Sequence, residues 1–557
     1  MRSALFGVAG AMALAGCSTS VTDRTFSPMT FNPPINEQSF AVDVRSTTTV
    51  KSVQIDAVGA GSAAMTPAGG LRYDATLALP ACAGAAEFTV TVRAAGFFSD
   101  RVNTFPDIGR FTHQINGQPE DCEAFEDGFA QTYLVDRTED FPDSDPGDGQ
   151  CFGVGAGDIS GCSLRAAVME ANASPGAELI RLQSQRYTLT RIGGEGDVGV
   201  DASVRDLDIT DDVTIEGQFG ANRDLGDFLT RSNQPADDLK DDPGSNFDFA
   251  KIDAGGIDRA FQVAAPGVVL RLRQLAVVNG EGAERGGGIL NAGELSLQRV
   301  ALVENDVSAQ IGPRGGGVYN SGQVVGEDVA FTQNGHVGAN SAGAAFYNDG
   351  GTVELNRALI AYNGSRFGAA FSNRSGGRVK LKNTTLHWNY WRNPNDAPVS
   401  VASTADDGTE TSYSFVTFSR HALGERNLVS TVSSGSATLA NTLFVNNVAD
   451  HCVGANQTAG GNVTDAPCTL SGTGAVADHI DVGIVSAAGA LDDRGGFTPV
   501  YPINAVAPPS SLFSAVDKGA APVAAFFDQR GAGFDRRVDG DEDGEAIADA
   551  GAFELED

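Results

Sequence analysis

Residues 363–392 carry the side chains that are best suited to binding chemistry. This stretch contains no Asp or Glu, although the whole chain has a net charge of −33, and it holds both tryptophans. Arg and Lys pair with uronate, sulfate or phosphate groups, and exposed aromatic rings bind the faces of sugars. An alternative is that the aromatic residues close an irregular loop and the charges keep that loop soluble. The candidate glycan-binding residues are Tyr362, Arg366, Arg374, Arg378, Lys380, Lys382, Trp388, Tyr390, Trp391 and Arg392.

The same stretch supplies candidates for an enzymatic alternative. A polysaccharide lyase needs a base beside a uronate and a cation that stabilises the carboxylate, and Arg378, Lys380 and His387 would be its first residues. However, the stretch has no acidic residue that could hold calcium near such a base. A glycoside hydrolase would need two opposed carboxylates, which the abundance of acidic residues leaves open. The sequence therefore favours binding without catalysis.

A second chemical candidate is an acidic segment near the end of the chain. Asp539, Asp541 and Asp543 occupy alternate positions and are followed by glycine, a spacing that lets three carboxylates surround one calcium ion. The twelfth position, where a calcium loop of this kind has a bidentate glutamate, is Ala550, with Asp549 just before it. Calcium is the only cofactor that the sequence suggests, and a solvated acidic turn is the alternative.

Asparagines that recur in two series indicate the elements that carry these residues. One series comprises Asn279, Asn305, Asn334, Asn363 and Asn389, and the other comprises Asn291, Asn320, Asn348 and Asn373. Successive members are 25 to 29 residues apart. Short apolar segments with period-two alternation lie between them, so each repeat is expected to be one coil of a β solenoid with stacked asparagines in its turns. Side chains alternate along a strand, so Tyr362 and Trp388 should point outward.

Size and charge agree with a large exported β protein. The chain has 557 residues, 69 glycines, and 38 basic against 71 acidic side chains. This acidic balance argues against nucleic acid or anionic lipid as a partner of the whole surface. The chain is long enough for two or three domains.

The N-terminus predicts the compartment. Met1 and Arg2 precede an apolar run that ends at Cys17 and is too short to span a bilayer permanently. Leu14–Cys17 resembles a bacterial lipobox, which implies acylation of Cys17 and a membrane anchor. Ser18 follows, which in that resemblance favours the outer membrane, facing either the medium or the periplasm. An ordinary signal peptide with an incidental cysteine is the alternative.

Six further cysteines favour disulfide bonds in an exported chain. Proximity in the sequence favours two short bridges, and elimination leaves a third, among fifteen possible connectivities. The expected pairs are Cys151–Cys162, Cys452–Cys468 and Cys82–Cys122.

Three segments resemble parts of known bacterial surface proteins. Cys162–Val168 and the following Glu170–Asn172 resemble the CSLREAI-type entry segment of surface β-helices, with Ala166 where that motif has glutamate. LRAAVMEAN can form a short helix that covers the first coil. Residues 275–390 resemble the repeats of polymorphic outer-membrane proteins. The motifs between Gly495 and Glu554 resemble a choice-of-anchor-type domain.

These features predict an all-β protein in which a small immunoglobulin-like β-sandwich precedes a right-handed parallel β-helix, a pectin-lyase-like solenoid. The expected segments are a lipoprotein signal peptide (1–17), a tether (18–30), the sandwich (31–112), an acidic connector (113–150), the β-helix with its cap (151–490) and a C-terminal cap domain (491–557). We expect a surface lipoprotein that binds anionic polysaccharide or a host or neighbouring cell. A lyase or hydrolase and a structural envelope component are the alternatives.

Overall fold

A computed structural model describes the strand backbones between residues 19 and 114 and most of residues 129–557. Within the second range it leaves out residues 194–199, 218–249, 391–399, 422–426, 505–512, 520–526, 539–546 and 556–557 and several shorter stretches. The chain divides near Gly128 into two compact units. In the described part no helix is both long and apolar enough to cross a membrane.

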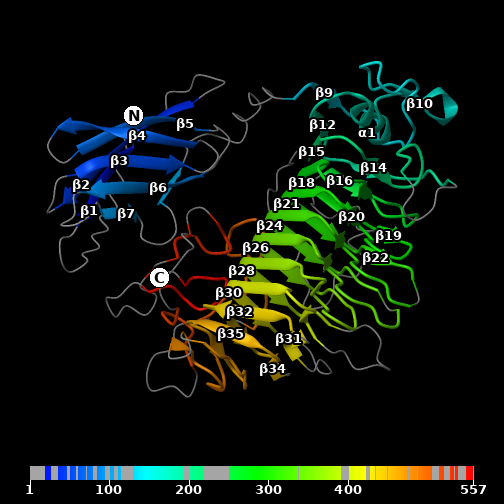
Figure 1. The fold of residues 1–557 in the computed structure, drawn as a ribbon. Helices are drawn as coiled ribbons and strands as arrows, with labels where there is room; N and C mark the ends of the chain where they lie inside the picture. Colours follow the sequence, from blue (N-terminus) through cyan, green and yellow to red (C-terminus); the bar gives the residue numbers. More distant parts are fainter. Residues whose placement is uncertain are drawn as a thin grey trace. The chain divides into compact units, whose positions relative to one another are not determined.

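The described residues of the first unit form eight antiparallel strands (Figure 1). They are β1 (Thr19–Phe26), β2 (Asn36–Ser46), β3 (Val50–Ala57), β4 (Gly61–Gly69), β5 (Arg72–Leu79), β6 (Ala85–Ala94), β7 (Arg101–Phe105) and β8 (Phe111–Gln114). Strand β4 pairs with β3 through its first half and with β5 through its second half. Val53 pairs with both Met65 and Val92, and all three are buried. The unit is antiparallel and all-β, whereas its assignment to the immunoglobulin-like class stays a prediction.

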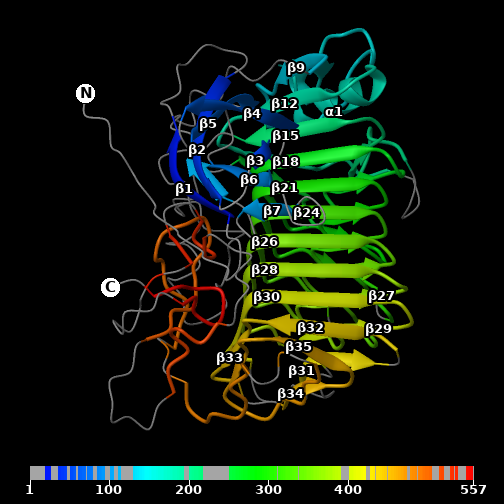
Figure 2. The same cartoon turned by 60° about the vertical axis from the view of Figure 1, so that its left-hand side comes forward.

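The second unit is a parallel β-helix, as predicted (Figures 1 and 2). One sheet stacks β9 (Gln131–Leu134), β12 (Glu178–Leu182), β15 (Val213–Gly217), β18 (Val269–Val278), β21 (Glu294–Val303), β24 (Gln323–Thr332), β26 (Thr352–Ala361), β28 (Arg378–His387), β30 (Glu410–Ser419), β32 (Ser436–Ala440) and β35 (Asn456–Gly460). The other stacks β14 (Leu207–Ile209), β17 (Phe261–Val263), β20 (Ile289–Asn291), β23 (Val318–Asn320), β25 (Phe346–Asp349), β27 (Phe371–Arg374), β29 (Ala402–Ala405), β31 (Asn427–Val432) and β34 (Asp450–Val453).

Shorter elements complete the coils. They are β10 (Gly153–Val154), β11 (Ser160–Gly161), β13 (Arg186–Thr188), β16 (Ala250–Asp253), β19 (Glu281–Gly282), β22 (Asp306–Val307), β33 (Leu443–Val445) and β36 (Val463–Thr464). Each ten-residue strand from β18 to β30 bends at a residue with positive φ, for example Arg299 and Arg357. This bend lets one strand form two sides of the coil. Alternate side chains fill the interior, where the Phe346 and Phe371 rings stack 4.8 Å apart.

Both asparagine ladders are present and buried. The amide of each asparagine donates to the next at 2.9–3.0 Å from Asn305 to Asn389, and at 2.7–2.8 Å from Asn291 to Asn373. The prediction that Asn279 begins the first ladder is wrong. Val278 pairs with Val303, which places Asn279 one position too early, and the backbone of Gly280 donates to Asn305 instead.

The first coils are covered by α1 (Leu164–Ala173), which packs against β12, β14 and β15. Ser163 caps its first turn by accepting a hydrogen bond from the amide of Ala166 at 3.0 Å. Ala166 is completely buried, so a small apolar side chain fits where the resembling motif has glutamate. The predicted capping helix is therefore confirmed.

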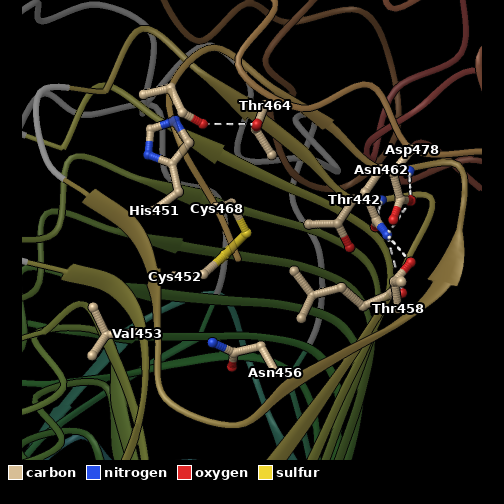
Figure 3. The surroundings of a disulfide bond; sticks show 12 residues. Thr442, His451, Cys452, Val453, Asn456, Thr458, Asn462, Thr464, Cys468 and Asp478 are labelled. Carbon is tan, nitrogen blue, oxygen red and sulfur yellow. Dashed lines mark hydrogen bonds between the residues drawn. A yellow bond between two sulfur atoms is a disulfide. The ribbon is translucent and has the colours of Figure 1, made fainter. Parts of the chain in front are cut away.

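Two of the predicted disulfides are confirmed. Cys151 is bonded to Cys162, and Cys452 is bonded to Cys468. The second bond joins paired positions of successive coils at the far end of the solenoid, beside the buried Asn456 (Figure 3). Cys17, Cys82 and Cys122 lie outside the described residues, so the lipidation site and the third disulfide stay predictions.

Candidate functional site

The described aromatic residues of the predicted glycan site, Tyr362, Trp388 and Tyr390, lie on the outside of the solenoid wall, but they are not fully exposed. The ring centres of Tyr362 and Trp388, in adjacent coils, lie 6.3 Å apart. The C-terminal segment after residue 482 folds back over this face (Figure 2). As a result Tyr362 is only 7% exposed and Trp388 and Tyr390 are half-buried, packed in one apolar cluster with Tyr501. The expectation of an open aromatic platform here is wrong.

The cations of that predicted site are distributed over several partners. Arg378 lies 3.3 Å from Glu410, and Lys380 lies 2.5 Å from Glu354, each in a neighbouring coil. The coils on either side therefore supply the acidic partners that are absent from the sequence of this coil. Arg366 and Lys382 are half-buried and have partners. Trp391 and Arg392 lie outside the described residues.

The lyase candidates do not come together. Arg378 begins β28 and His387 ends it, while Lys380 lies beside Arg378 on the outer face. His387 is fully buried and its Nδ1 lies 2.8 Å from the hydroxyl of Ser419. Burial, together with the neighbouring His421 and Arg420, holds the pKa of His387 well below its ordinary value. A neutral imidazole sealed from solvent cannot reach a polysaccharide.

The predicted calcium residues are only partly described. Asp539, Asp541 and Asp543 lie outside the described residues. Asp549 is buried and accepts hydrogen bonds from the backbone amides of Asp517 and Leu555 at 2.8 and 2.7 Å. Its carboxylate thus holds two parts of the C-terminal segment together through hydrogen bonds to their backbone amides. Among the described residues there is no group of three or more His, Cys, Asp or Glu side chains placed to hold a metal ion.

A different outer face carries a cluster that we call the arginine–tyrosine surface. It comprises Arg285, Arg314, Tyr319, Tyr347, Asp349 and Arg374. Tyr319 and Tyr347 point outward because their neighbours in β23 and β25 point into the core and the asparagine ladder. Their rings stack with centroids 5.5 Å apart and only 5° between the ring planes. The two side chains form a continuous aromatic strip over two coils, but the rings are only 3% and 5% exposed and pack with Ala342 and Phe367, so the strip is covered.

Two arginines cover this strip. The guanidinium carbon of Arg285 lies 5.3 Å from the centre of the Tyr319 ring, and that of Arg314 lies 5.0 Å from the Tyr347 ring. Cation–π attraction of this kind holds each guanidinium in place. Within the described part of the chain, neither guanidinium makes a hydrogen bond or ion pair. Their donor groups are thus positioned on a rigid support and available to an external acceptor.

The charges below the strip are arranged differently. Asp349 accepts hydrogen bonds from the hydroxyls of Tyr319 and of Ser375, the latter at 2.6 Å. Burial would raise the pKa of Asp349, but these hydroxyls and the arginines hold it below its ordinary value. Burial and the bond to Asp349 raise the pKa of Tyr319. At neutral pH the carboxylate is therefore ionised and already engaged, while the phenol keeps its proton.

Sequence reasoning missed this surface although a signal for it was present. Tyr319 and Tyr347 each precede an asparagine of the second ladder, just as Tyr362 and Trp388 precede members of the first. The rule that the residue before an inward asparagine points outward applies to both ladders. The arginines could not be found in this way, because they lie in the preceding coil turns.

No protein-family model matches the chain, and no curated protein matches it. Among solved structures the chain is similar to the crystal structure of pectate lyase Pel9A, with a TM-score of 0.33 and 12% sequence identity. The match covers 77% of this chain and 97% of that chain.

Proposed function

We propose that this chain is a lipid-anchored surface protein whose β-helix binds acidic glycans without cleaving them. The observation that supports this is the pair of guanidinium groups of Arg285 and Arg314, held over tyrosine rings with no acceptor in the described part of the chain. Guanidinium forks bind carboxylate and sulfate in bidentate geometry. The rings of Tyr319 and Tyr347 are themselves buried, so they hold the two guanidinium groups in place and do not offer a face to a sugar.

A lyase at this surface is less well supported. The hydroxyl of Tyr319 is the nearest group that could act as a base, but it is buried and donates to Asp349. A base must be deprotonated at the working pH, whereas the raised pKa of this phenol keeps it protonated. The arginines would neutralise an acidic sugar, but the carboxylate at this surface, Asp349, is already engaged by the hydroxyls of Tyr319 and Ser375.

Titration of the soluble form, lacking Cys17, with polygalacturonate, alginate and a sulfated glycan tests the proposal by calorimetry. We expect saturable binding that falls at least about tenfold in Arg314→Ala, because a hydrogen bond to a charged group contributes about 1.5–3 kcal/mol. Arg378→Ala is the matched control, since Arg378 is an exposed arginine on the other sheet. No heat of binding with any acidic glycan, or an equal loss in both variants, would overturn the proposal. Unsaturated products absorbing in the ultraviolet would favour a lyase instead.

The anchor is tested separately. Acylation of Cys17 would place the protein in the membrane fraction, because several acyl chains on one residue bind a bilayer stably. Replacing Cys17 with serine should release the protein into the soluble fraction. If the variant stays with the membrane, the anchor lies elsewhere in the chain.

A further inference from the structure

We infer, on the basis of the proposed function, that Arg285 and Arg314 together bind one phosphate monoester group carried by the glycan. The two arginines occupy bridged positions in adjacent coils. The guanidinium carbon of each lies over the tyrosine of the following coil, 5.3 Å from the centre of the Tyr319 ring and 5.0 Å from that of Tyr347. Because adjacent coils are stacked about 4.8 Å apart, the two guanidinium groups lie about one coil spacing from each other.

The pair is isolated along the solenoid. The position that follows Arg314 in the bridged series is Ala342, and the position after that is Phe367. Ala342 and Phe367 pack against the buried tyrosine rings, so apolar side chains close this side of the pair. The Nε of Arg374, which lies in a later coil, donates to the hydroxyl of Ser372 at 3.2 Å. The site therefore offers two adjacent guanidinium groups to one compact group.

The carboxylate beside the pair does not neutralise it. Asp349 accepts hydrogen bonds from the hydroxyls of Tyr319 and Ser375, so these groups engage both of its oxygens. It also pairs in register with Arg374, whose positive charge offsets its own. Arg285 and Arg314 thus keep close to two positive charges between them, held near each other by the rings beneath.

Two fixed cations at this separation favour a ligand group with two negative charges. A phosphate monoester carries about −1.5 to −2 at pH 7 and has three acceptor oxygens, so it can accept from both guanidinium groups and neutralise both. A carboxylate carries one charge, and a single guanidinium fork uses both of its oxygens. A sulfate ester has the tetrahedral shape but only one charge. The phosphate monoester therefore matches the pair best.

Three sugars that differ only in their acidic group test this inference: glucose 6-phosphate, glucose 6-sulfate and glucuronate. Each is titrated by calorimetry at pH 7.5 into the soluble full-length chain that lacks Cys17. We expect the phosphate to bind at least about tenfold tighter than the other two, because it gains a charge-assisted hydrogen bond to the second guanidinium. Arg285→Ala and Arg314→Ala should each lower this affinity at least about tenfold, and the control Arg378→Ala should leave it unchanged.

The pH dependence gives a second readout. The second proton of a phosphate monoester leaves with a pKa of about 6, so the affinity for glucose 6-phosphate should rise about fivefold from pH 5 to pH 7.5. Glucose 6-sulfate stays singly charged, so its affinity should stay within about twofold. The protein groups beside the pair act on both ligands, so the sulfate corrects for them. These groups are Glu284, Tyr319, Tyr347, Asp349 and Asp406.

The contrary outcomes separate this inference from the proposed function. Equal affinity for the three sugars would overturn the preference for phosphate and leave glycan binding intact. No binding of these sugars or of any acidic polysaccharide would overturn the proposed function as well. A single variant that keeps the wild-type affinity would show that each arginine binds its own anion. Inorganic phosphate that binds tighter than glucose 6-phosphate would assign the site to free phosphate. Circular dichroism of each variant checks that the β-helix is intact.

Discussion

Two outer faces of one solenoid carry the same unit, an arginine over an outward aromatic ring, yet the two arginines differ in what they bind. Arg420 lies 5.2 Å from the Trp388 ring and donates to the carbonyl of Gly489 at 2.5 Å. Arg314 lies 5.0 Å from the Tyr347 ring and has no such acceptor in the described part of the chain. The rings are covered on both faces, but the Arg420 guanidinium is engaged inside the fold, whereas the Arg314 guanidinium is left for an external partner.

The difference arises from the residues that surround each unit. Around Trp388 the outward positions of the long strands are small and apolar, including Ala301, Ala330 and Ala361, and all three are buried in the cluster that the C-terminal segment joins. Smooth apolar surface of this kind favours coverage by another segment. Tyr347 is covered by its own neighbours, Ala342, Phe367 and Arg314, and the charge of Arg314 stays at the surface because burying it would cost free energy. An outward aromatic residue alone does not therefore predict an exposed site.

The largest effect is expected from releasing the C-terminal segment. Arg536 is fully buried, lies 3.4 Å from Glu554, and donates to Asn383 of β28 at 3.0 Å. Arg536→Ala removes the buried guanidinium that donates to Glu554 and Asn383 and leaves these buried acceptors without it, so we expect a loss of about 3–5 kcal/mol in the free energy of unfolding. Urea unfolding followed by tryptophan fluorescence measures it. Arg494→Ala removes an exposed arginine of the same segment and should change little. Equal effects of both substitutions would contradict this role of Arg536.

Smaller losses of stability are expected from substitutions at Trp388 and Arg314, and they should show which of the two faces binds glycan. Trp388 is half-buried, so Trp388→Ala should cost about 2 kcal/mol of stability, somewhat less than a fully buried tryptophan. It should leave glycan affinity unchanged, whereas Arg314→Ala should reduce affinity and cost at most about 1 kcal/mol of stability. Urea unfolding and calorimetric titration of both variants give the four values. Loss of affinity in Trp388→Ala would identify the face around Trp388 as the glycan site.

The repeat made much of the fold predictable from sequence. Period, glycine turns and stacked asparagines predict the parallel coils, and proximity predicts Cys151–Cys162 and Cys452–Cys468 correctly. Asn279 was misplaced because one residue in a turn shifts the register without changing the local pattern. Register is set by which residues pair between neighbouring coils, and a single sequence does not show these pairings.

The candidate site was less predictable because its determinants are distant in the chain. Charge patterns along one coil did not show that Glu354 lies over Lys380, 26 residues away. The fold-back of the C-terminal segment rests on contacts such as the 2.5 Å hydrogen bond from Thr385 to Gln529, which are 144 residues apart. Neither contact has a local signature. The outward direction of Tyr319 and Tyr347 did have one.

The C-terminal segment that covers Trp388 should also make the free energy of unfolding depend on pH. Burial raises the pKa values of Asp549 and Glu554 in the C-terminal segment, helped by repulsion from Asp517 on the first and from Asp549 on the second, so the folded state holds protons more tightly than the unfolded chain. This contribution is complete below about pH 4 and is lost as the pH rises through the raised values. We expect stability to fall by about 1 kcal/mol between pH 5 and pH 8. Glu554→Gln should flatten this decline in urea unfolding, and an unchanged slope would contradict the assignment.

The smallest effect is expected on the exposed sheet, where the sequence alone placed the glycan and lyase candidates. The side chains of Lys380 and Glu354 are 61% and 51% exposed, so water screens their ion pair. Lys380→Ala should change stability by less than about 0.5 kcal/mol, because exposed ion pairs contribute little. Its cation is neutralised by Glu354, so the substitution should also leave glycan affinity within twofold of the wild type, whereas Arg314→Ala should not. Calorimetric titration of both variants with the same polysaccharide makes the comparison. A large loss in Lys380→Ala would mean that the ligand displaces Glu354 and that paired cations count as binding sites, which would remove the distinction between the two sheets.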